Sequence, residues 1–170
     1  FCYLFLRSLK LSNIASIFGA IAMSNIGYLT VWTEQLIVIQ SVLFLPLILL
    51  CINFYIETKK RYLFWLIPIF LAFSFFGGHP QSVVYVYLIT FLYSFFKGIS
   101  PAKIFLCFVF ALGISAIQLL PSLELYKYSA RENSLQRQLI LTAALPWKNL
   151  STIFAPDYFG SPATFNFRGM

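Results

Sequence analysis

Long apolar runs separated by short polar stretches organise the first 120 residues of the chain. After an apolar stretch over 1–6, which resembles the end of a helix, five runs follow at about 13–32, 36–56, 62–76, 82–96 and 104–120. A membrane-spanning helix needs roughly 20 apolar residues, with a range of about 17 to 25. The pattern predicts an all-α, polytopic transmembrane helical bundle with one partial span and five complete spans.

Two of these runs contain polar or helix-bending residues. Pro46 lies within 36–56, where it predicts a tolerated kink in a helix that is long enough to span alone. Ser16, Asn25 and further hydroxyl residues interrupt 13–32. We therefore expect the helix over 13–32 to pack among other helices rather than face lipid.

Basic residues occur only in alternate loops between the runs. Cytoplasmic loops of membrane proteins are enriched in Lys and Arg. The first, third and fifth loops are therefore predicted to be cytoplasmic, whereas Glu34, His79 and all residues after Pro121 are predicted to lie outside. The basic residues of these loops are Arg7, Lys10, Lys59, Lys60, Arg61, Lys97 and Lys103.

The runs 62–76 and 82–96 are short for complete spans. Fifteen helical residues extend about 22 Å, less than the bilayer core of about 30 Å. Either flanking residues lengthen these helices, or the Gly-Gly-His-Pro-Gln turn at 77–81 is recessed below the outer membrane surface. The two glycines are expected to end the first helix, and Pro80 to begin the next.

The composition supports a membrane protein and excludes several other classes. The chain is 60% hydrophobic, 19% aromatic and 10% charged, with a mean hydropathy of +0.83. Soluble domains average roughly 25% charged residues, and disordered chains are poor in aromatics. The net charge of +7 is dispersed between apolar runs, so no nucleic-acid partner is expected. We expect no metal site, since the cysteines lack paired spacing and the histidine lacks nearby carboxylates; the sequence identifies no cofactor and leaves a divalent cation open.

Residues 121–170 differ in composition from the transmembrane region 1–120. They carry more charge and several turn-forming residues, which predicts the start of an extracytoplasmic juxtamembrane segment. A helix leaving the membrane is expected to reach about residue 134. Because the chain opens within an apolar run and lacks an initiator Met, we interpret it as an internal fragment of a longer protein.

His79 and Glu34 are the candidate catalytic residues. His79 has a side chain that can carry a proton or contact a phosphate near neutral pH. The alternative is that His79 caps a helix within a tight turn. Glu34, beside Trp32, is a candidate general base, and the alternative is a solvated carboxylate at the membrane boundary.

Four residues are candidates for substrate binding. Gln81 adds a polar group to the His79 turn. Glu124 and Arg131 have the spacing of one helix face, which also suits a simple surface pair. Asp157 lies in a proline-containing turn, where it can also bond its own backbone.

Several short stretches together resemble the bacterial YfhO-like membrane proteins. They are Gly-Gly-His-Pro-Gln at 77–81, Gln-Leu-Leu-Pro-Ser-Leu-Glu-Leu at 118–125, Ser-Ala-Arg at 129–131, Leu-Pro-Trp-Lys-Asn-Leu at 145–150 and Phe-Ala-Pro-Asp-Tyr-Phe-Gly at 154–160. That family resembles the GT-C glycosyltransferases, which take a sugar from a polyprenyl-phosphate carrier on the outer face of the membrane. The resemblance implies a catalytic carboxylate in the first outer loop. No Asp or Glu precedes Glu34, so the resemblance places that loop upstream of Phe1.

The resemblance implies a glycosyltransferase of the bacterial cytoplasmic membrane that modifies a cell-envelope polymer or lipid. Its expected partners are the lipid bilayer and a polyprenyl-phosphate sugar donor, whose phosphate Arg131 and His79 are expected to contact. The alternatives are a transporter or flippase of a lipid-linked or amphipathic substrate, and a non-catalytic membrane scaffold. An acidic pair in an upstream outer loop favours the enzyme, whereas inverted repeats favour the transporter.

Overall fold

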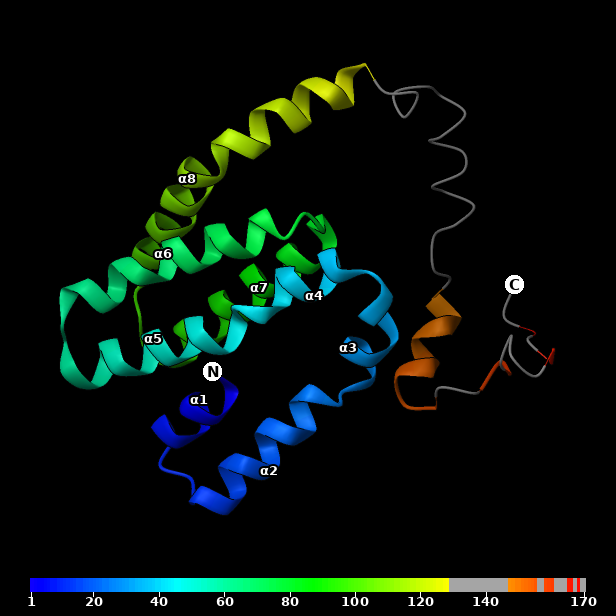
Figure 1. Cartoon of the computed structure of the whole chain (residues 1–170), viewed down its shortest axis with the longest axis horizontal. Helices are drawn as coiled ribbons and strands as arrows, with labels where there is room; N and C mark the ends of the chain where they lie inside the picture. Colours follow the sequence, from blue (N-terminus) through cyan, green and yellow to red (C-terminus); the bar gives the residue numbers. More distant parts are fainter. Residues whose placement is uncertain (129–146, 156–157, 161–164, 167, 169–170) are drawn as a thin grey trace. The chain divides into compact units, whose positions relative to one another are not determined.

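The computed structural model describes residues 1–128, 147–155, 158–160, 165–166 and 168. Within these residues 81% of the chain is helical and none is in a strand, which confirms the predicted all-α class. Two compact units, Phe1–Ser122 and Leu123–Met170, are described separately. In chain order the elements are α1 Cys2–Ser8, α2 Asn13–Ser24, α3 Gly27–Val31, η1 Trp32–Glu34, α4 Leu36–Leu43, α5 Leu45–Thr58, α6 Arg61–Phe76, α7 Pro80–Phe96, α8 Pro101–Lys127 and η3 Trp147–Ile153 (Figure 1).

Three helical stretches are long and apolar enough to cross a membrane. They are Asn13–Glu34, Leu36–Thr58 and Pro101–Lys127, with 22, 23 and 27 residues. The remaining apolar helices, α6 and α7, have 16 and 17 residues and extend roughly 24 to 26 Å. The five complete spans therefore remain a prediction, whereas the length and composition of these three stretches indicate a membrane protein.

Helices α4 to α7 pack together and bury the core of the first unit (Figure 1). Ile48 and Ile52 of α5, Leu71 of α6 and Val86 of α7 are at most 1% exposed. Ala111 of α8 completes the same cluster. Because lipid is as apolar as these side chains, close packing rather than escape from water holds such helices together in a membrane.

The kink predicted at Pro46 is confirmed. Helix α4 ends at Leu43, and α5 begins at Leu45 with Pro46 in its first turn. Proline is tolerated there because the first N–H groups of a helix have no partner within it.

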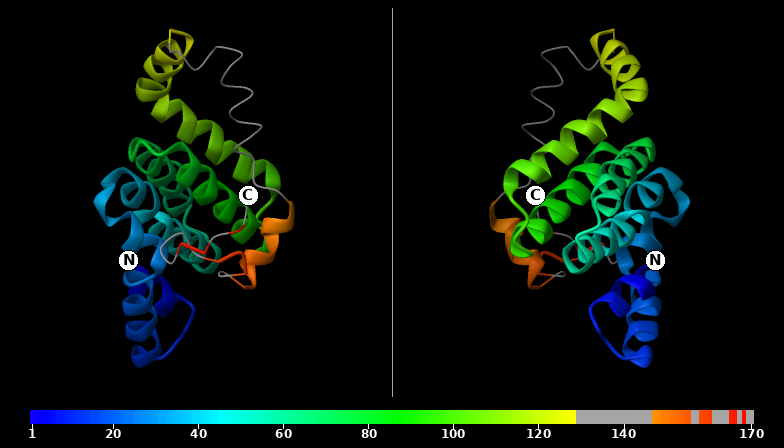
Figure 2. Two further views of the ribbon diagram at one scale, coloured as in Figure 1. Left: turned by 90° about the vertical axis from the view of Figure 1, so that its right-hand side faces the viewer. Right: turned by 90° about the vertical axis from the view of Figure 1, so that its left-hand side faces the viewer.

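The expectation that the helix over 13–32 packs among other helices is not met within the described chain, where 6% of the Asn13–Glu34 window is buried. The stretch breaks into α2 and α3, and Ser16 is the one buried residue of α2. Its polar side chains satisfy themselves locally: Ser24 Oγ and Asn25 Nδ2 each donate to the carbonyl of Ile21 at 2.8 Å. Helix α2 lies beside α1 (Figure 2). Phe18 on α2 is 73% exposed.

Helix α8 extends beyond the apolar run that predicted it. It continues through Pro121 to Lys127, which agrees with the helix predicted to leave the membrane after residue 120. The predicted continuation to residue 134 lies outside the described residues.

Gly77 allows α4 and α6 to approach with their backbones in contact. A Cβ atom at this position would lie 2.5 Å from both the backbone nitrogen and the Oγ of Ser41. One turn earlier, Ser74 Oγ donates a hydrogen bond to the carbonyl of Ser41. Gly78 follows with φ of 84°, and Pro80 begins α7 as predicted.

Changing Gly77 to Ala should destabilise the bundle because the added methyl group meets backbone that cannot rotate away. Overpacking of this kind costs about 1–3 kcal/mol. Gly113→Ala is the matched control, since a Cβ there meets nothing within 4 Å. Thermal unfolding in detergent should show a lower midpoint for Gly77→Ala and an unchanged or higher one for Gly113→Ala. Equal midpoints would show that the backbone contact does not limit stability.

Candidate functional site

The turn between α6 and α7 places His79 beside residues of two other helical segments, α4 and η1. His79 is the N-cap residue of α7, so its position is set by the first turn of that helix. Its backbone N–H donates to Ser41 Oγ of α4 at 3.3 Å. Its ring lies 6.4 Å from the Trp32 ring of η1, centroid to centroid.

The hydrogen bonds of His79 define the protonation of its ring. The backbone N–H of Ser82 lies 3.2 Å from His79 Nδ1, and Ser82 Oγ lies 2.6 Å from the same nitrogen. Because a backbone N–H can only donate, Nδ1 accepts, and the hydroxyl of Ser82 donates to it as well. Tyr28 OH, at 2.7 Å from Ser82 Oγ, then donates to that oxygen. This arrangement assigns the ring proton to Nε2.

The expectation that His79 caps a helix is therefore confirmed. The ring is half-buried, and Nε2 has no hydrogen-bond partner among the described residues. With Nδ1 occupied as an acceptor, His79 presents the N–H donor of Nε2. Such a donor binds acceptor oxygens of the kind found in phosphates and sugars.

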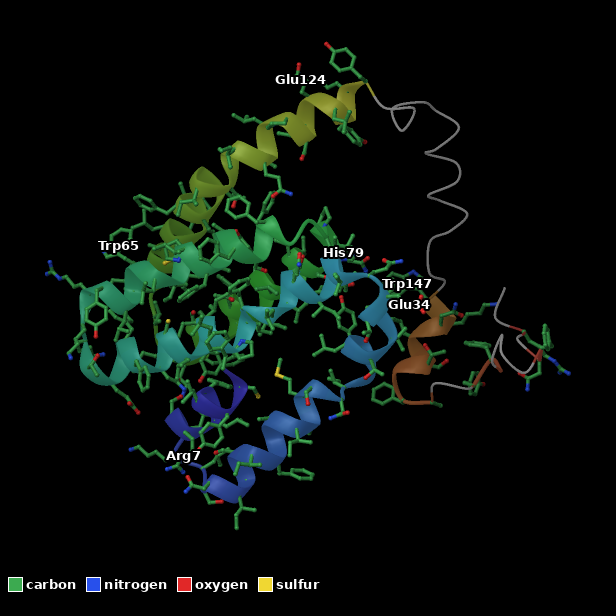
Figure 3. All side chains as sticks on the ribbon, in the orientation of Figure 1. Arg7, Glu34, Trp65, His79, Glu124 and Trp147 are labelled. Carbon is green, nitrogen blue, oxygen red and sulfur yellow. The ribbon has the colours of Figure 1, made fainter. Side chains whose placement is uncertain are left out.

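Glu34 lies at the same end of the first unit as His79 (Figure 3), and Gln81 lies in the first turn of α7, which His79 caps. Gln81 is exposed, and its Nε2 donates to Tyr85 OH at 2.7 Å. Glu34 ends η1, two residues after Trp32, and its side chain is exposed. No ion pair or hydrogen bond joins the Glu34 carboxylate to another described side chain, so it is open to solvent or a ligand.

An apolar groove of about 650 Å³ begins beside this polar cluster. Tyr28 and Tyr85 line the groove, and their hydroxyls are the ones that contact Ser82 and Gln81. The two tyrosines thus join an apolar channel to polar groups at its end. The remaining lining comes from α2, α3, α4, α5 and α7: Ala22, Met23, Ile26, Leu29, Val42, Leu45, Val86 and Ile89.

The sequence did not reveal Tyr28, Ser82 or the groove. Tyr28 and Ser82 are 54 residues apart, and no local pattern pairs them. The contact between Gln81 and Tyr85 had a signal, because residues four apart share one face of a helix.

The other three predicted binding residues lie outside the first compact unit. Glu124 is exposed on α8 within the second compact unit, which is described by itself. Arg131 and Asp157 lie outside the described residues.

The chemistry of the cluster is that of polar donors and hydroxyls. No group of three or more His, Cys, Asp or Glu residues that could hold a metal ion occurs in the described part of the chain. Comparisons with family models, curated proteins and solved structures found no match to this chain.

The assigned proton position can be measured directly because His79 is the single histidine of the chain. With ¹⁵N-labelled histidine, the nitrogen spectrum of the neutral ring in detergent should show an unprotonated Nδ1 and a protonated Nε2. Ser82→Ala should leave the backbone cap but weaken the bond to Nδ1 and shift its signal. A spectrum with the proton on Nδ1 would contradict the assigned direction of the Tyr28, Ser82 and His79 hydrogen bonds.

Proposed function

We propose that this chain belongs to a YfhO-like, GT-C-type glycosyltransferase of the bacterial cytoplasmic membrane that uses a polyprenyl-phosphate-linked sugar at the outer face. The observation that supports this best is the apolar groove lined by Tyr28, whose hydroxyl bonds to Ser82 and through it to His79. A polyprenyl-phosphate sugar consists of a long apolar chain, a phosphate and a sugar with hydroxyl groups. The apolar groove matches the chain, and the polar groups of the His79 cluster match the phosphate and the sugar. The acceptor is a cell-envelope polymer or lipid.

In this proposal the groove holds the first isoprene units of the donor. Apart from the two tyrosines, its lining consists of aliphatic side chains and Met23, so the groove suits a branched hydrocarbon. Lipid-facing exposure of α2 lets the remaining chain extend into the bilayer.

The phosphate lies near the start of α7. His79 Nε2–H donates to a phosphate oxygen, and the positive end of the helix dipole of this 17-residue helix favours the negative charge. Gln81, Glu124, Arg131 and Asp157 are proposed to contact the donor or acceptor, and Glu34 is the candidate base. The roles of Arg131 and Asp157 rest on the sequence alone.

A transporter or flippase of a lipid-linked substrate is the second candidate. Helices α6 and α7 are short, and a non-helical turn with the polar side chain of His79 separates them. Discontinuous helices of this kind form substrate sites in many transporters. Movement of a lipid-linked sugar across proteoliposomes without sugar transfer would favour this function over the enzyme.

Filling the groove should reduce sugar transfer. Ala22→Phe adds a ring within the groove lining, whereas Ile14→Phe lies on the same helix at a position 82% exposed and outside the groove. Sugar transfer from a labelled polyprenyl-phosphate donor, measured in membranes at matched expression, should fall roughly tenfold for Ala22→Phe, the size of an overpacking penalty. The control should match the wild type; equal activity of both variants would remove the groove from the site.

The orientation can be tested by labelling single cysteines on intact cells with an impermeant maleimide. Cys2, Cys51 and Cys107 are first replaced by Ala. Thr33→Cys and Ser161→Cys should react from outside, whereas Lys60→Cys should react only after the cells are opened. The reverse pattern would invert the topology and place the His79 cluster on the cytoplasmic side.

A further inference from the structure

A second pocket, of about 240 Å³, lies at the end of the first unit opposite His79. Helix α7 begins at the His79 turn and ends at Phe96, beside this pocket. Helices α1 and α5 end at the same place, at Ser8 and Thr58. The lining residues are Ser8, Leu9, Lys10, Asn53, Ile56, Glu57 and Lys97.

Asn53 fixes the floor of this pocket by joining three helices. Its side chain is 5% exposed, and its Nδ2 donates to Ser8 Oγ of α1 at 2.9 Å. Tyr93 OH of α7 donates to Asn53 Oδ1 at 2.7 Å, and Ser8 Oγ donates to the carbonyl of Phe5 at 2.6 Å. The floor is therefore a built structure whose polar groups are already satisfied.

The rim of the pocket carries charges of both signs. The Lys97 ammonium lies 5.4 Å from the centroid of the Tyr93 ring, which holds it at the rim. Lys10 and Glu57 are exposed on the same lining. No ion pair joins Glu57 to Lys10 or Lys97 in the described structure, so the opposite charges face the pocket separately.

The local electrostatics favour a ligand that carries both charges. Helix carboxyl ends have negative partial charge, and three of them meet here beside the Glu57 carboxylate. A purely anionic ligand would meet this negative charge as well as the two lysines. A zwitterion can place its anion at the lysines and its cation at the carboxylate.

We propose that this pocket binds the headgroup of phosphatidylethanolamine, with the phosphodiester between Lys10 and Lys97 and the primary ammonium at Glu57. The primary ammonium donates hydrogen bonds to a carboxylate, which the quaternary ammonium of phosphatidylcholine cannot do. Phosphatidylglycerol lacks the cation and leaves Glu57 without a partner. Leu9 and Ile56 on the lining meet the start of the lipid chains. The proposal is independent of the sugar-transfer site.

The test is lipid retention by the purified chain in nanodiscs that contain equal amounts of the three lipids, read by native mass spectrometry. Phosphatidylethanolamine should be retained about fivefold over the other two lipids, the range that an exposed ion pair supplies. Glu57→Gln should shift the preference toward phosphatidylglycerol.

A double variant tests the phosphate contacts. Lys97→Gln keeps the side-chain length, and Lys10→Gly suits the backbone because Lys10 has φ of 64°. This variant should lose the preference, whereas Lys103→Gln, a lysine outside the pocket lining, should keep it. Thermal unfolding verifies that each variant is folded.

Three results would overturn the proposal. One is retention without headgroup preference in the wild type. Another is a double variant that binds like Lys103→Gln while folded. The third is displacement of the lipid by soluble phosphoethanolamine at equal concentration, which would make the pocket a site for a soluble phosphate compound.

Discussion

The backbone contact between Gly77 and Ser41 is the constraint from which the functional end of the bundle follows. It lets the backbones of α4 and α6 meet at this position, and Ser74 and His79 bond to Ser41 on either side of it. In a membrane such close approach supplies dispersion contacts and hydrogen bonds where the hydrophobic effect does not act between helices. The turn after α6 is consequently fixed against Ser41 of α4, and α7 starts from this turn.

Helix α7 connects the two polar ends of the unit. Its start holds the chain of donors from Tyr28 through Ser82 to His79, beside the apolar groove. Its end contributes Tyr93 to the Asn53 network and Lys97 to the second pocket. Between these ends its buried face packs into the apolar core. The loops that carry Lys or Arg and the loops that lack them therefore lie at opposite ends of the first unit.

The sequence predicted those features that depend on local rules. Apolar run length predicted the helices, and the fixed geometry of proline predicted the break at Pro46 and the start of α7 at Pro80. The division of 13–32 into α2 and α3 was not predicted. A polar side chain that bonds its own helix, such as Asn25, has the same sequence pattern as one that bonds a neighbouring helix. The groove and the Tyr28 contact depend on how distant helices cross, which no periodicity encodes.

The central claim is that the groove beside His79 holds the polyprenyl chain of the substrate. Photo-cross-linking tests it most directly, with a polyprenyl phosphate that carries a diazirine on an isoprene unit near the phosphate, followed by mass spectrometry of the labelled peptides. The account predicts labels on α2, α3 and α7 at groove positions such as Met23, Leu29 and Ile89, reduced by Ala22→Phe. Labels spread evenly over the lipid-exposed face of α8, and unaffected by Ala22→Phe, would contradict it.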